Sequence, residues 1–205
     1  MKMKKITEAL FNIGIPSPIR PHEGCILLSS PFLLEEGFTH SVGLIIDYDA
    51  AEGATGAIMN NVSACRLSEV VNGVDQARDI RVFNGGPLGK DRLYFIHTLG
   101  NDIINGAREF TPGLYVGGEF DDVIDYINAG YCVDEAVRFF IGYCCWGKSQ
   151  LEEEISDGIW ATGTAPSKPG ILLSGSGDRY WHRTVRMFGN AYRSWNILPR
   201  HAEFN

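Results

Sequence analysis

Short apolar runs separated by Gly- and Pro-rich turns dominate the hydrophobic pattern of the chain. Runs rich in aliphatic, β-branched and aromatic residues are typical of strands. We therefore predict strands at 25–30, 41–48, 52–60, 81–86, 91–98, 113–118, 136–146 and 159–163. The few residues between 41–48 and 52–60 predict a hairpin. The run AVRFFIGYCCW at 136–146 is the most apolar, and we expect it to form a central strand.

Helical spacing of apolar residues marks a smaller set of segments. We predict helices at 66–73, 120–130 and 149–158 and one that begins near Asp178, while residues 2–11 favour a short one. Ser149, followed three residues later by Glu152, has the pattern of an N-terminal capping box. Because the early strands follow one another and the helices come later and singly, the order indicates an α+β fold rather than a regular βαβ alternation.

The composition is that of an ordinary globular protein. The 205 residues are 44% hydrophobic and 21% charged, which predicts one domain over residues 1–205 with a polar, Pro-rich lead-in at 1–23. The formal net charge of -7 argues against binding to nucleic acids, because such binding depends largely on neutralising phosphates.

The cysteines and the lengths of the apolar runs indicate the cellular compartment in which the protein is expected. The five cysteines include no C-x-x-C pair, which favours a reducing environment. Glu8 and Asn12 interrupt the apolar run after the basic start, so we expect no signal peptide. No stretch approaches the ~18 apolar residues that a membrane span requires. We therefore predict a cytoplasmic protein without membrane contact.

The segment VFNGGPLGKDRLYFIHT at 82–98 resembles a phosphate-binding loop at first sight. A P-loop has four residues between its two glycines, then a lysine and a hydroxyl residue. Here only three residues separate the glycines, and Asp91 follows the lysine. Pro87 also lacks an N–H group that a phosphate cradle would use. We interpret Gly85, Gly86 and Pro87 as a tight turn, which also permits close approach of the backbone to a ligand.

Three acid–base side chains are candidates for catalysis. His97 lies alone in a strand-like run, where a histidine is more often a hydrogen-bonded core residue than a base. Glu154 lies one helical turn from Gln150, and this pair beside Trp146 is a candidate pocket lining. Asp91, His97 and Glu154 together are the groups that a small-molecule hydrolase would use.

Metal and nucleic-acid sites are weakly supported. The histidines are scattered, and neither H-E-x-x-H nor paired C-x-x-C spacing occurs, so we predict no metal site and no cofactor. Arg179, Arg183 and Arg186 recur at helical spacing opposite the apolar Trp181 and Val185, and form the strongest basic patch. No second helix precedes them as in a helix-turn-helix. We favour a solvated face paired with acidic neighbours over direct nucleic-acid binding.

Four blocks resemble one family. They are GCILLSSPFLLEEGFTHSVGLIIDY, GATGAIMNN, VFNGGPLGKDRLYFIHT and RFFIGYCCWGKSQLEEEI, and the match spans roughly Gly24 to Phe188. Their order and spacing are similar to those of the AlgH/YqgE family. Tyr48 stands where the family often has His after an acid, Asn61 where it often has Lys, and Ser149 where Gly is usual.

The resemblance implies a bacterial, cytoplasmic protein with an α+β fold of bent or barrel-like, mostly antiparallel sheets flanked by helices. It brings no defined reaction, and regulation of transcription is implied by the family name alone. The candidates for one shared cleft are Ser41, Asn60, Gly85, Gly86, Pro87, Asp91, His97, Trp146, Gln150 and Glu154. We predict a non-catalytic regulatory protein that binds a small ligand or a protein partner. The hydrolase and the arginine-based nucleic-acid binder are the alternatives.

Overall fold

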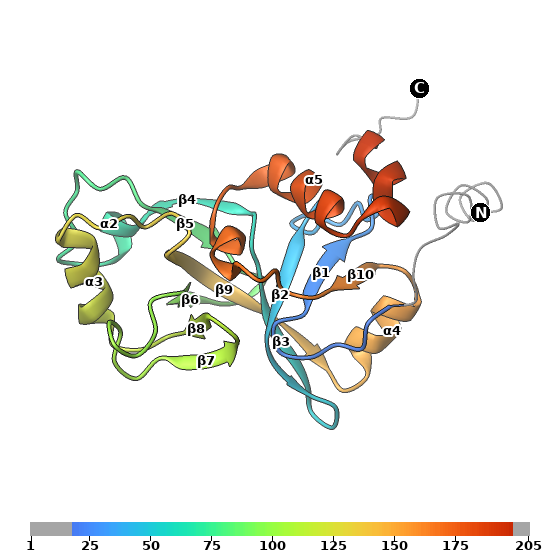
Figure 1. Ribbon diagram of the computed structural model, residues 1–205, viewed down its shortest axis with the longest axis horizontal. Helices are drawn as coiled ribbons and strands as arrows, with labels where there is room; N and C mark the ends of the chain where they lie inside the picture. Colours follow the sequence, from blue (N-terminus) through green and yellow to red (C-terminus); the bar gives the residue numbers. More distant parts are fainter. Residues whose placement is uncertain (1–17, 199–205) are drawn as a thin grey trace.

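A computed structural model describes residues 18–198, whose elements Figure 1 labels in chain order. The strands are β1 (Ile26–Ser29), β2 (Val42–Asp49), β3 (Gly53–Ile58), β4 (Val62–Arg66), β5 (Arg81–Asn84), β6 (Leu88–His97), β7 (Arg108–Thr111), β8 (Leu114–Val116), β9 (Val137–Gly147) and β10 (Trp160–Gly163). The helices are α2 (Leu67–Val70), α3 (Phe120–Asn128), α4 (Gln150–Ser156) and α5 (Gly177–Met187), with 3₁₀ helices η1 (Pro169–Leu173) and η2 (Asn190–Ile197). The short helix predicted at 2–11 lies outside the described residues.

The strands form one open, mostly antiparallel sheet. Its order is β10-β1-β2-β3-β9-β6-β8-β7, and a side ladder joins β4 to β5 and β5 to β9. Within the described residues the pairing of β5 with β9 is parallel, and the other pairings are antiparallel. The predicted α+β class and the hairpin of β2 with β3 are confirmed. The sheet does not close into a barrel, because β10 and β7 form its two ends.

β9 is the central strand, as its apolar sequence predicts. Residues 137–141 lie between β5 and β6, whereas residues 144–147 pair with β3. Gly142 separates the two parts and has a φ of +73°. A Cβ at this position would lie 2.5 Å from the carbonyl oxygen of Gly86 and 2.9 Å from that of Leu88. Only glycine combines this backbone conformation with so close an approach.

Gly85, Gly86 and Pro87, which we predicted to form a tight turn, do not connect β5 and β6 as a hairpin. β5 and β6 do not pair with each other, because β9 lies between them. The chain instead crosses β9 near Gly142, where a Cβ on Gly85 would overlap the Gly142 carbonyl and one on Gly86 would overlap the backbone of Tyr143. The two glycines therefore serve a crossing of two backbones.

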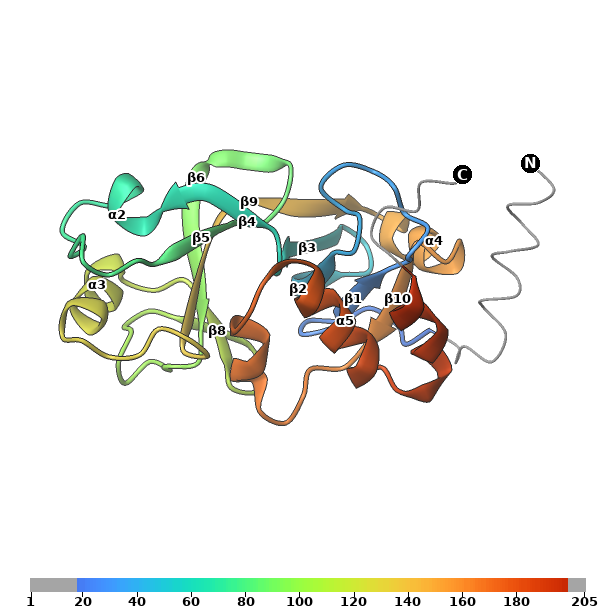
Figure 2. The same ribbon diagram turned by 90° about the horizontal axis from the view of Figure 1, so that it is seen from above.

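β9 connects two lobes of the molecule (Figures 1 and 2). One lobe holds β4 to β8 with α2 and α3, and its core includes Phe95, Val123 and Phe139. The other holds β1 to β3, β10, α4 and α5, with Trp181 of α5 packed among the side chains of β1 and β2. The sequence patterns did not predict β4 and β7. No helix among residues 18–198 is long and apolar enough to cross a membrane.

Candidate functional site

An aromatic cleft lies where α4, β9 and β10 meet the loop at 30–40. Its volume is about 250 Å³. Its apolar lining comes from Leu33, Phe38, Pro87, Trp146, Ile159 and Trp160, and its polar lining from Glu35, Gln150, Glu154 and the two cysteines 144 and 145. Four of the candidate residues therefore line this cleft: Pro87, Trp146, Gln150 and Glu154.

Glu154 is the most heavily bonded side chain of the cleft. Its Oε2 accepts hydrogen bonds from the indole N–H of Trp146 at 2.9 Å and from that of Trp160 at 2.8 Å. Its Oε1 accepts one from Nε2 of Gln150 at 2.9 Å. Both indole rings are buried, so these N–H groups depend on the carboxylate for a partner. The half-buried Glu154 is thereby fixed at the wall of the cleft.

The start of α4 differs from the predicted capping box. Ser149 adopts a left-handed conformation with a φ of 62° and makes no side-chain capping bond. Glu152 instead accepts a hydrogen bond from the Tyr48 hydroxyl at 2.6 Å. Gln150 closes the turn, because its Oε1 accepts the backbone N–H of Gly147 at 3.0 Å. A capping residue usually has an extended backbone, and the left-handed backbone of Ser149 departs from that geometry.

The two adjacent cysteines face different surroundings. Cys144 is buried, and burial raises the pKa of its thiol to about 12. This side chain is therefore protonated and unreactive at neutral pH. Cys145 is exposed at the cleft. The alternation of a strand accounts for the difference between the two neighbours.

A second hollow of about 460 Å³ adjoins the aromatic cleft. Phe38 and Pro87 line both hollows. Gly86 and Lys90 belong to the second hollow alone. The shared residues make the two hollows neighbours, so an extended ligand has room beyond the aromatic cleft.

His97, the last residue of β6, is a structural residue that pairs with Val137 at the start of β9. Its side chain is fully buried, its Nδ1 accepts the backbone N–H of Leu99 at 3.2 Å, and its Nε2 lies 3.2 Å from the Gly117 carbonyl oxygen. These two bonds place the proton on Nε2 and leave the ring neutral. Burial lowers the pKa of His97. Both ring nitrogens of His97 have backbone partners, as expected for a hydrogen-bonded histidine of the core.

The three acid–base candidates do not form one catalytic centre. His97 pairs with Val137 at the start of β9, whereas Glu154 bonds to Trp146 near its end. The nine residue steps from 137 to 146 correspond to roughly 30 Å of extended strand. Asp91 is exposed, in the irregular part of β6. Proton transfer requires direct or one-water contact, so these three side chains do not act together in one proton-transfer step.

Ser41 and Asn60 belong to a different junction, between the end of loop 30–40 and α5. Asn60 accepts the backbone N–H of Val42 at 2.9 Å and donates to the carbonyl oxygens of His40 at 2.9 Å and Gly177 at 3.0 Å. Ser41 donates to the Phe38 carbonyl at 2.7 Å. Both residues are buried. They do not line the aromatic cleft, so the expectation of one shared cleft is wrong for this pair.

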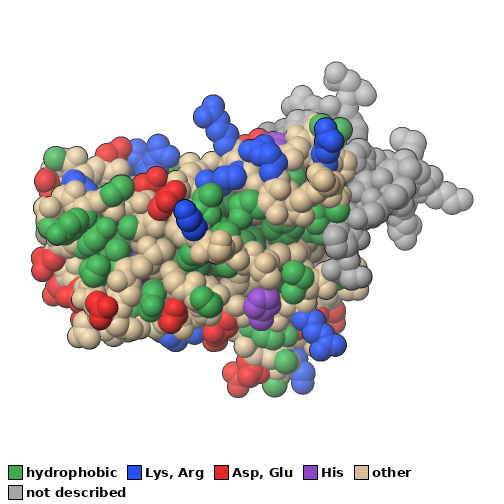
Figure 3. All heavy atoms as spheres, viewed as in Figure 1, with side chains coloured by type: hydrophobic (Ala, Val, Ile, Leu, Met, Phe, Trp, Pro, Cys, Tyr) green, Lys and Arg blue, Asp and Glu red, His purple; other side chains and the backbone are tan. Residues whose placement is uncertain are grey.

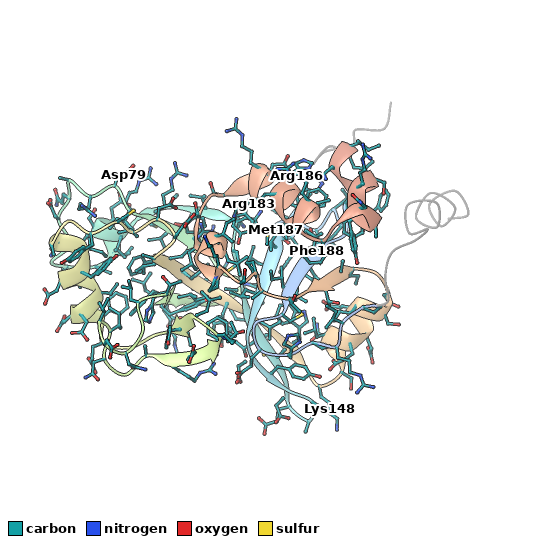
Figure 4. All side chains as sticks on the ribbon, in the orientation of Figure 1. Asp79, Lys148, Arg183, Arg186, Met187 and Phe188 are labelled. Carbon is teal, nitrogen blue, oxygen red and sulfur yellow. The ribbon has the colours of Figure 1, made fainter. Side chains whose placement is uncertain are left out.

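The three arginines of α5 do not act as one basic face. Arg183 is half-buried, and its guanidinium donates to the carbonyls of Ile171 and Ser174 and lies 4.5 Å from the ring centroid of Tyr180 (Figure 4). Only Arg179 and Arg186 are exposed. On the face shown in Figure 3, several Lys and Arg side chains lie along the upper edge, separated by uncharged and apolar surface rather than joined in a continuous patch.

Comparison with known sequences decides the family. A family model described as AlgH-like matches residues 26–193. This chain belongs to the AlgH-like family. It is 33% identical over 187 residues to a "UPF0301 protein" of Bacteroides thetaiotaomicron, a match that covers 91% of this chain and 93% of that protein. It is 36% identical over 169 residues to one of Chlorobaculum tepidum, covering 82% and 88%.

Two solved structures share the fold of this AlgH-like chain. The solution structure of the AlgH protein from Pseudomonas aeruginosa has a TM-score of 0.63 and 27% identity, and the match covers 88% of this chain and 95% of that one. A crystal structure of a Corynebacterium diphtheriae protein has a TM-score of 0.70 and 21% identity, covering 92% and 97%. The latter likeness concerns the fold alone.

Proposed function

We propose that this AlgH-like protein is a non-catalytic binding protein. Its ligand inserts an apolar group that carries a positively charged or amide N–H donor into the aromatic cleft. The observation that carries the proposal is Glu154, a carboxylate fixed by Trp146, Trp160 and Gln150 at the wall of a hollow. Buried aromatic rings beside one oriented polar group are typical of small-ligand sites.

The hydrogen-bond capacity of Glu154 supports the choice of a donor. A carboxylate offers about four acceptor positions, and three N–H groups occupy positions on Glu154. The remaining position suits an N–H group of the ligand. Glu35 also lines the cleft, and tryptophan faces attract cations, so a guanidinium or ammonium group is favoured over a carboxylate.

A regulatory role, which the family name implies, is part of this proposal. Regulation through the cleft depends on whether a small ligand or a side chain of a protein partner occupies it. Direct reading of nucleic acid is disfavoured, because Arg183 is committed to backbone carbonyls and the net charge of the chain is -7. A small ligand and a side chain of a protein partner would present the same N–H donor to Glu154. Titration of the protein with a probe of each kind distinguishes these two sources.

Nuclear magnetic resonance of the indole N–H groups tests the proposal. The full chain is titrated with phenethylamine, as the small ligand, and with N-acetyl-Phe-Arg-amide, as the mimic of a partner side chain. We expect the Trp146 and Trp160 signals to move. The Trp181 signal is an internal control, because its N–H donates to the Ser29 carbonyl inside the core.

Two matched comparisons make this titration specific. Glu154→Gln should abolish saturation, whereas Glu153→Gln on the exposed side of α4 should not change it. Bound ligand should also slow alkylation of Cys145, which lines the cleft, but not of exposed Cys132. Equal shifts with N-acetyl-Phe-Glu-amide, or no movement of the two indole signals with either probe, would refute the proposal.

A further inference from the structure

A cluster of two histidines and a carboxylate lies at the junction between loop 30–40 and α5. Nδ1 of His40 lies 2.6 Å from Oδ1 of Asp178, and Nε2 of His182 lies 3.2 Å from Oδ2 of the same carboxylate. One ligand atom from each of the three residues lies within 4.8 Å of the others. Asp178 and His182 share one face of α5 because they are four residues apart.

The three side chains are held in place from outside the cluster. The His40 ring stacks on Trp181 with centroids 3.9 Å apart and planes 3° apart. His40 also adopts a left-handed backbone with a φ of 48°, a conformation that non-glycine residues rarely adopt. Nδ1 of His182 lies 3.3 Å from Oδ1 of Asn196, as a partner that orients a metal-binding histidine does.

Asn60 fixes the two segments that carry these ligands. The side-chain amide of Asn60 donates to the backbone carbonyls of His40 and Gly177. The backbone carbonyl of Asn60 accepts the N–H of Gly177 at 2.7 Å. Gly177 is the first residue of α5 and directly precedes Asp178. The buried amide of Asn60 therefore sets the distance between His40 and Asp178, and it explains why a family motif residue lies here rather than at the cleft.

We propose that His40, Asp178 and His182 form a binding site for a divalent transition metal ion of the zinc type. Imidazole and carboxylate are ligands that Zn²⁺ takes in proteins, with bonds of about 2.0–2.1 Å. Ligand atoms around a tetrahedral ion of that size lie about 3.3 Å apart, so the His182–Asp178 pair already fits and the His40–Asp178 pair has to widen. The proposal departs from the expectation of no metal site.

The exposure of the cluster suits an ion that enters from solvent. The His40 side chain is 0% exposed, while those of Asp178 and His182 are 41% and 22% exposed. Three protein ligands leave a fourth position for water or a ligand atom. Because histidine binds metal in its neutral form, metal affinity should fall on acidification. The site is independent of the aromatic cleft and of the function proposed for it.

Cobalt absorption and histidine resonances test this site. The full-length, tag-free chain is treated with chelator, desalted, and titrated with Co²⁺ and with Zn²⁺. We expect one equivalent of Co²⁺ to give visible d–d bands without a thiolate charge-transfer band, and Zn²⁺ to abolish them by competition. Zn²⁺ should also move the imidazole resonances of His40 and His182, while those of buried His97 and exposed His22 stay in place.

Variants locate the ion. His182→Gln and Asp178→Asn should each weaken Co²⁺ binding at least tenfold, and His22→Gln should leave it unchanged. If a variant unfolds, the resonances of the wild-type chain decide the question by themselves. The proposal would be overturned if the His40 and His182 resonances did not move, or if both folded variants bound Co²⁺ as tightly as wild type. The cluster would then be only a hydrogen-bonded contact between the loop and α5.

Discussion

His97 and Glu154 are joined to opposite ends of the same strand, and their surroundings separate a structural polar residue from a binding one. Both have hydrogen-bond partners on more than one side-chain atom. The partners of His97 are backbone groups within its own lobe, and its ring is sealed from solvent. The partners of Glu154 are side chains, two of them aromatic, at the wall of a hollow.

The two side chains differ in how much of their hydrogen-bonding capacity is free for a ligand. His97 has one donor and one acceptor in its neutral ring, and both are used by Leu99 and Gly117. Glu154 keeps acceptor capacity beyond its three bonds, and it faces space that a ligand can fill. Saturation of hydrogen-bonding capacity, rather than burial or membership of a motif, therefore distinguishes the two positions.

Replacing His97 should give a large loss of stability without loss of binding. His97→Leu leaves the Leu99 N–H and the Gly117 carbonyl without partners in the core, and each such loss costs about 1–3 kcal/mol. We expect the free energy of unfolding to fall by about 3 kcal/mol in urea titrations, with ligand binding at the aromatic cleft retained. Asp91→Asn, at an exposed position of the same strand, should stay within about 0.5 kcal/mol of wild type. A stable His97→Leu protein that no longer binds would reverse the roles assigned here.

Replacing Glu154 should separate stability from binding. Glu154→Ala removes the acceptor of two buried indole N–H groups, so we expect a loss of about 2–4 kcal/mol in the free energy of unfolding. Glu154→Gln keeps a carbonyl oxygen for the indoles and should cost less than about 1 kcal/mol. Neither variant should bind a cationic ligand. The measurement is urea unfolding beside the indole titration, and equal losses of stability in the two variants would contradict the assigned role of the carboxylate.

The strands were predictable because their cause is local. The runs at 25–30, 41–48 and 136–146 are apolar enough to be buried on both faces, and β1, β2 and β9 form there. The short strands β4 and β7 escaped prediction because their sequences VSACR and REFT carry no such run. β4 and β7 are strands because they pair with β5 and β8, not because their own sequences favour a strand.

Pairing between distant segments set the limit of the sequence analysis. The strand that separates β5 from β6 begins some forty residues later along the chain, so Gly85 and Gly86 alone indicate a turn but not a crossing. The aromatic cleft was partly predictable, because Trp146, Gln150 and Glu154 are near one another in sequence. The junction was not, because 138 residues separate His40 from Asp178.

The pH dependence of stability gives the smallest and sharpest contrast between the two ends of β9. Burial lowers the pKa of His97, so between about pH 6.5 and this lowered pKa the unfolded chain binds a proton that the folded chain excludes. The contribution of His97 is therefore complete above about pH 6.5 and is lost as the pH falls, by at most about 1.4 kcal/mol per pH unit.

Comparison with His97→Gln isolates this contribution. The other titrating groups are shared by the two proteins, so the difference between their urea midpoints at about pH 7.5 and about pH 5.5 reports position 97. We expect the wild-type chain to lose more stability on acidification than the variant. Equal losses would mean that the imidazole accepts its proton in the folded state. The sealed ring with two backbone partners would then be an incomplete description of this end of β9, and the contrast with Glu154 would fail.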